Sequence, residues 1–139
     1  MTHDLLLWLH FVSLALGGAS TFGNAVVGAA VARQGEAARP HLLPVARSLG
    51  RLGHVALALL ILTGGALVEM GPGWSGVGLW FWVKMALVAT LTVSVVLVTR
   101  AARMAAGGDA AAGRRARLLG RLNMLLIPLI VLTAVFEFG

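Results

Sequence analysis

A histidine and an asparagine, His10 and Asn24, lie inside the first long apolar stretch of the chain, residues 5–32. Polar groups are costly inside an apolar helix, so each of them is a candidate for function. Helical spacing puts them on one stripe with mostly small neighbours: His10, Leu14, Gly17, Thr21, Asn24 and Gly28. We expect this face to turn towards the other helices and to carry the chemistry of the protein.

His10 has two interpretations, and the sequence leaves both open. In the first, its imidazole is an axial ligand to the iron of a b-type haem, and Gly17 leaves room for the flat macrocycle. In the second, it is a buried histidine that donates a hydrogen bond to a facing carbonyl group. Under the first interpretation His10 is the metal ligand and Gly17 belongs to the cofactor site.

Lys84 and His54 are the other candidates for the cofactor site. Lys84 either pairs with a carboxylate of a cofactor or substrate, or extends to the lipid headgroups. His54 follows Arg51 by one turn, so it is either a ligand or proton relay, or a histidine at the membrane interface. At about 1.5 Å per residue, His10 and His54 should lie roughly 15 Å apart along the membrane normal, which disfavours one iron held by both. No pattern identifies a catalytic residue.

The composition predicts the elements that position these residues. The chain has 139 residues, of which 59% are hydrophobic and only 12% are charged, about half the charged fraction of a soluble domain. Its apolar blocks, residues 5–32, 49–70, 79–99 and 118–138, each reach the ~20 residues that cross a bilayer. We expect an all-α fold in which one transmembrane domain, residues 1–139, is an antiparallel bundle of four helices. The expected helices cover about residues 4–33, 46–70, 79–104 and 114–138.

The basic residues orient this bundle. The net charge is +6, and every lysine or arginine except Lys84 lies in or at the edges of the links between the first and second blocks and between the third and fourth: Arg33, Arg39, Arg47, Arg51, Arg100, Arg103, Arg114, Arg115, Arg117 and Arg121. Basic loops stay in the cytoplasm, so we expect both termini outside, in an inner (plasma) membrane of the bacterial type. The distribution explains the charge without a nucleic-acid partner. The expected partners are the lipid bilayer and either further copies of the chain or the subunits of a membrane complex.

Two absences narrow the chemistry. The chain contains no cysteine, so it has no disulfide, no thiolate metal ligand and no attachment point for c-type haem. The first apolar stretch lacks a basic region before it and is longer than the core of a signal peptide. We therefore expect this stretch to be retained as a helix.

Two segments resemble a known family: WLHFVSLALGG at residues 8–18 and LWFWVKMALVATL at residues 79–91. They are similar to the superfamily of HemJ-type protoporphyrinogen oxidases and copper-resistance D domains. In that group a histidine sits early in the first helix, and a tryptophan shortly precedes a lysine in a later helix. The matching residues are His10, Trp82 (or Trp80) and Lys84. The resemblance implies a small helical bundle that holds b-type haem, with His10 as a ligand.

Three functions remain open. The first is a haem-b-binding membrane protein with an electron-transfer or porphyrin-related redox role. This function includes an oxidoreductase similar to protoporphyrinogen oxidase. The second is a non-catalytic subunit that packs within a larger membrane complex, and the third is a small carrier that uses His10 and Lys84. The chain has Ser94 and its neighbours where HemJ-type proteins have a second histidine, so haem binding does not by itself imply oxidase activity.

Overall fold

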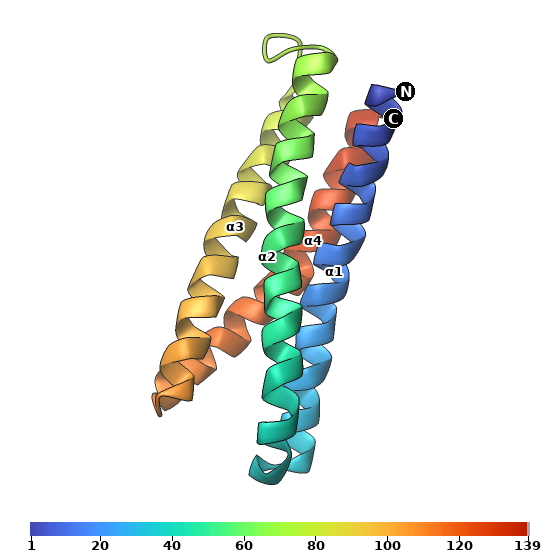
Figure 1. Ribbon diagram of the computed structural model, residues 1–139. Coiled ribbons are helices and arrows are strands. Elements are labelled where there is room, and N and C mark those ends of the chain that lie inside the picture. The colour runs from blue at the N-terminus through green and yellow to red at the C-terminus, as the bar shows by residue number, and fades with distance from the viewer. Residues whose placement is uncertain (139) are drawn as a thin grey trace. The chain divides into compact units, whose positions relative to one another are not determined.

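The computed structural model describes residues 1–138, with side chains up to residue 136, and the regular structure in this range is helical. Its elements are α1 (Thr2–Gln34), the 3-10 helix η1 (Glu36–Ala38), α2 (Arg39–Met70), α3 (Leu79–Ala106) and α4 (Ala110–Phe138) (Figure 1). The four α-helices are long and apolar enough to cross a membrane. The predicted all-α class and its four long apolar helices are confirmed. Insertion into a bilayer and its orientation stay predictions.

The helices form two compact units, Met1–Ser75 and Gly76–Gly139. The first contains α1, η1 and α2, and the second contains α3 and α4. Within each unit the two long helices run antiparallel and pack against each other as a hairpin. A four-helix bundle is consistent with these elements, and a single domain over residues 1–139 stays a prediction.

Helix α2 begins at Arg39, earlier than the start near residue 46 that the sequence indicates. Pro40 and Pro44 are residues typical of a loop, but in the structure both lie inside α2. Pro40 occupies the first turn, where a backbone N–H has no partner within the helix. Pro44 lies one turn further on, where its missing N–H removes a single bond to a carbonyl of the first turn. Prolines this close to the start of a helix are therefore compatible with it.

Small residues line the contact between α1 and α2. A methyl group added at Gly17 would lie 3.7 Å from the Cβ of Ala56, which is ordinary contact. Ser20 is buried, and its hydroxyl donates a hydrogen bond of 2.5 Å to the carbonyl of Leu49 on the other helix. Gly53 faces the same serine, and a methyl group added there would come 2.5 Å from Ser20 Oγ. The two backbones approach closely, as they do at small-residue contacts between membrane helices.

The second unit packs along buried residues whose spacings are three, four or sums of threes and fours. They are Phe81, Leu91, Ser94 and Ala101 on α3 and Ala112, Asn123, Leu126, Ile130 and Thr133 on α4. The rings of Trp80 and Phe136 stack with centroids 5.4 Å apart, so the start of α3 lies beside the last turns of α4. At the other end, Gly108 has a φ of +103°, a conformation that glycine adopts readily in a tight turn. The spacing is typical of antiparallel helices that cross at a shallow angle.

Candidate functional site

His10 is half-buried on α1, and its Nδ1 lies 2.8 Å from the hydroxyl oxygen of Thr63 on α2. Thr63 is 4% exposed, and its hydroxyl is also 2.6 Å from the carbonyl oxygen of Leu59, one turn earlier in α2. Because a carbonyl can only accept, the threonine donates its single proton to Leu59. Thr63 Oγ1 is then the acceptor towards His10, so the imidazole carries a proton on Nδ1.

This hydrogen bond defines the chemical state of the imidazole. When a neutral histidine carries its proton on Nδ1, the lone pair that can bind a metal is on Nε2. Histidine ligands typically donate the other ring N–H to an outer partner, which holds the ring in its orientation. The pair His10 and Thr63 has this arrangement. The partner is a side-chain hydroxyl, where the alternative interpretation of the sequence expects a backbone carbonyl.

Gly64 and Phe11 surround the same ring. A methyl group added at Gly64 would come 3.4 Å from Cε1 of His10, so the imidazole lies against the bare backbone of α2. The ring of Phe11 meets it edge-on, with centroids 6.4 Å apart and planes at 68°. A glycine directly after Thr63 therefore gives the imidazole the space it needs to reach the hydroxyl.

Gly17, predicted as part of the cofactor site, lies on the same face of α1 as His10. The seven residues from His10 to Gly17 match the seven from Thr63 back to Ala56, which is the neighbour of Gly17 on α2. Helix packing thus accounts for a small residue at this position. Its role beside a macrocycle stays a prediction.

His54 lies on another face of α2. Its side chain is exposed, and its Nδ1 donates a hydrogen bond of 2.7 Å to the carbonyl of Gly50, one turn earlier. Nine residues separate it from Thr63, which is about 13 Å along the axis and about two and a half turns of helix. Within the first unit, His54 is therefore well removed from the imidazole of His10, as the residue counts indicated. Its own role in a cofactor site stays a prediction.

Lys84 belongs to α3 in the second unit. Its ammonium nitrogen lies 5.3 Å from the centre of the Phe81 ring, one turn earlier on the same helix, in cation–π geometry. Phe81 is buried and also meets the ring of Trp82 edge-on. His10 and Lys84 belong to different units, and their joint action stays a prediction.

Thr63 is a residue of this candidate site that the sequence pattern does not reveal. It sits in a long apolar run, where one hydroxyl changes the polarity of the stretch very little. The register of the α1–α2 hairpin identifies Thr63. Once Gly17 is set against Ala56, the same antiparallel pairing brings Thr63 level with His10.

The fold and this site define an all-helical protein with four membrane-length helices and one oriented histidine inside its first hairpin. Among the described residues, no three histidine, cysteine, aspartate or glutamate side chains gather into a group that could hold a metal ion. None of three comparisons, with protein-family models, with curated proteins and with solved structures, gives a match to the chain.

Proposed function

We propose that the chain is a multi-pass membrane protein that binds b-type haem, with an electron-transfer or porphyrin-related redox role and with His10 as an axial ligand. The observation that carries this proposal is the chain of hydrogen bonds from His10 Nδ1 to Thr63 and on to the carbonyl of Leu59. It keeps the metal-binding lone pair on Nε2 and fixes the plane of the ring. A bound haem supplies one-electron redox chemistry at its iron.

The surroundings of His10 fit such a group. A porphyrin supplies four nitrogen ligands of its own, so the protein needs to provide only one or two. Phe11, whose ring meets the imidazole edge-on, is more than half exposed. It gives a flat apolar molecule a ring to contact beside His10. In this proposal Gly17, on the same face of α1 as His10, is the secondary candidate beside the cofactor, and His54 takes no part in holding this haem.

The test is the visible spectrum of the protein purified in mild detergent from cells supplied with a haem precursor. We expect a Soret band that shifts on reduction with dithionite and that is lost in His10→Ala. The matched control is His54→Ala, because this histidine lies on another face of α2 and bonds within its own helix. The control should keep the band.

Two results would contradict the proposal. One is a colourless wild-type protein with full helical content by circular dichroism, which favours a non-catalytic subunit of a larger complex. The other is a His10→Ala variant that retains an unchanged Soret band. Co-purification of a partner in fixed stoichiometry with a colourless chain would support the subunit function further.

We further propose that both termini face the outside of an inner (plasma) membrane and that the α1–α2 and α3–α4 links are cytoplasmic. Arg33 and Arg39 flank the first link, and Arg103 and Arg114 flank the second. Lys84 is the one basic residue near the opposite ends of the helices. Positively charged links resist transfer across the membrane, and this asymmetry supports the orientation.

A further inference from the structure

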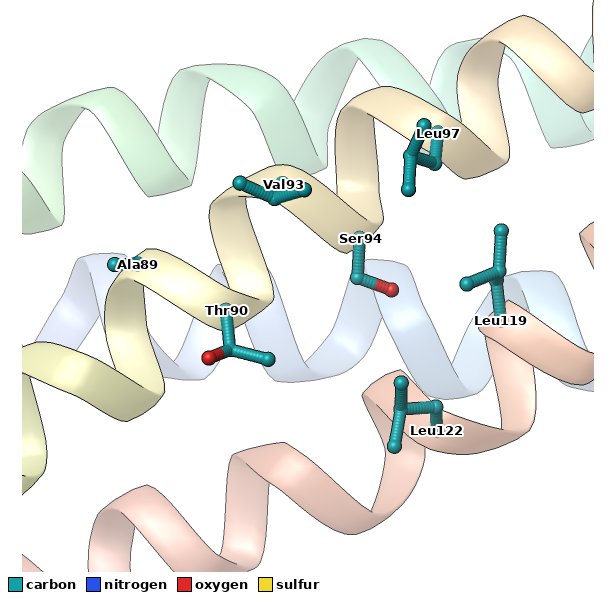
Figure 2. Close-up of a pocket in the computed structure, with 7 residues that line it drawn as sticks. All are labelled: Ala89, Thr90, Val93, Ser94, Leu97, Leu119 and Leu122. Atoms are coloured by element: carbon teal, nitrogen blue, oxygen red, sulfur yellow. The ribbon is translucent and has the colours of Figure 1, made fainter.

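A groove runs along α3 and α4 within the second unit. Its first part, with a volume of about 400 Å³, lies between apolar side chains that include Val93 and Leu97 of α3 and Leu122 of α4 (Figure 2). Its second part, of about 520 Å³, continues from Leu97 towards the α3–α4 turn. Leu97 and Leu119 line both parts, so the two open hollows adjoin along the helix pair.

The end of the groove near the turn is positively charged. Arg100 of α3 and Arg115 of α4 line the second part, and both side chains are exposed. The carboxylate of Asp109 lies 4.0 Å from the guanidinium group of Arg115. Two guanidinium groups against one carboxylate leave a site that suits an anion, and guanidinium groups bind phosphate oxygens in particular.

The length of the groove matches one leaflet of a bilayer. From Ala89, at its apolar end, to Arg100 there are eleven residues, or about 16 Å of helix. Half of a hydrocarbon core is about 15 Å thick. A molecule whose phosphate meets the two arginines would therefore lay an acyl chain along the apolar part and end near the middle of the bilayer.

We propose that this groove is a binding site for one anionic phospholipid of the surrounding membrane. Arg100 and Arg115 bind the phosphate group, and the apolar walls formed by Val93, Leu97 and Leu122 contact an acyl chain. The arginines recognise the negative headgroup, and the groove adds contact with the chain, so the site favours an anionic lipid over a zwitterionic one. This inference rests on the membrane insertion proposed above and is independent of haem binding.

The experiment measures lipid adducts of the full chain by native mass spectrometry in detergent. The probes are phosphatidylglycerol and phosphatidylcholine with identical acyl chains. We expect the wild type to retain one phosphatidylglycerol in preference to phosphatidylcholine. Each basic residue near an anionic surface contributes about fivefold in affinity, so Arg100→Gln/Arg115→Gln should bind phosphatidylglycerol about 25-fold more weakly.

The matched control is Arg103→Gln/Arg114→Gln, which removes the same charge from the same turn but from residues outside the groove. It should keep the preference for one phosphatidylglycerol. Equal losses in the two double variants would show a diffuse attraction to the basic turn and would overturn the site. Absence of any preference in the wild type would overturn it as well.

A second pair of variants tests the apolar wall. Leu97→Trp fills the groove where its two parts join, whereas Val96→Trp adds the same side chain at an exposed neighbour that does not line it. We expect Leu97→Trp alone to lose the lipid adduct, with the helical content of both variants unchanged. Unchanged lipid binding in Leu97→Trp would overturn the proposal. A wild-type dimer that dissociates in Leu97→Trp would overturn it too, because it would show that a second copy of the chain occupies the groove. A negative Soret test would leave all these outcomes unaffected.

Discussion

The hydroxyl of Thr63 joins two groups in the first hairpin, the imidazole of His10 and the carbonyl of Leu59. A hydroxyl group can donate along its own helix and at the same time accept from a neighbour. A valine has the same shape without either capacity. The role of Thr63 as a positioning residue can therefore be separated from its role in packing.

We expect Thr63→Val to weaken haem binding by about 10- to 100-fold, which is the usual effect of removing the outer partner of a histidine ligand. Thr63→Ser keeps the hydroxyl and should bind haem with nearly wild-type affinity. Titration of the purified chain with haem, followed at the Soret maximum, gives both affinities. Equal affinity of the valine variant and the wild type would show that the hydrogen bond does not support ligation.

Gly53 provides a second test at the residue scale. Its replacement by alanine places a methyl group against Ser20 Oγ, and overpacking of this kind costs about 1–3 kcal/mol. The control is Gly50→Ala, since a methyl group there meets nothing within 4 Å. Denaturant titration in detergent should show Gly53→Ala less stable and Gly50→Ala unchanged or more stable. Equal stability of the two variants would contradict the close approach of α1 and α2.

At the scale of the elements, the start of α4 depends on one carboxylate. The backbone N–H of Ala112 donates a hydrogen bond of 3.1 Å to Asp109 Oδ1, so Asp109 caps the helix. We expect Asp109→Ala to lose about 1 kcal/mol of stability and Asp109→Asn, which can still accept this bond, to lose less. Hydrogen exchange at Ala112 should accelerate in the alanine variant. Unchanged exchange there would exclude a capping role.

In the α3–α4 hairpin, the buried side-chain oxygens of Ser94 and Asn123 lie at a similar height along the helix pair. The side-chain oxygens of Ser94 and Asn123 have no hydrogen-bond partner in the described part of the chain. Counting from the stacked pair Trp80 and Phe136, Ser94 is fourteen residues on and Asn123 is thirteen residues back. A serine hydroxyl that turns towards the asparagine oxygen, directly or through one water, would satisfy both.

We therefore expect Ser94→Ala and Asn123→Leu to be coupled. Polar pairs between membrane helices average about 0.6 kcal/mol in double-mutant cycles, and a value of this order is the expected outcome. The measurement is the unfolding free energy of the two single variants and the double variant. Strict additivity would show that the two side chains act separately.

The sequence predicts the four helices well because their apolar runs are long and their charges lie at the links. It predicts the start of α2 poorly, because prolines are tolerated in a first turn and are also typical of loops. His10 and Gly17 of the stripe face α2 as expected, yet the buried residues of α1 are Ser13 and Ser20 on its flank. A hydroxyl bonded to the backbone of its own or a facing helix is buried as readily as an apolar group, and spacing alone does not reveal that bond.

At the scale of the whole molecule, the absence of cysteine makes the proposed orientation easy to test. Single variants Gln34→Cys, beside the α1–α2 link, and Ser75→Cys, in the α2–α3 turn, each introduce the only thiol. We expect a membrane-impermeant maleimide to label Ser75→Cys in intact cells and Gln34→Cys only after lysis. Labelling in the reverse order would contradict the orientation with both termini outside.

The short link between α3 and α4 has a consequence for biosynthesis. Only residues 107–109 separate the two helices, so in the proposed topology the two helices have almost no slack between them and enter the bilayer together as a hairpin. Drawing even one arginine through the hydrocarbon centre costs about 2.5–3.5 kcal/mol on insertion scales, and Arg103, Arg114 and Arg115 lie close to the bend. In the proposed orientation these arginines keep the bend on the side of synthesis while the outer ends of α3 and α4 cross.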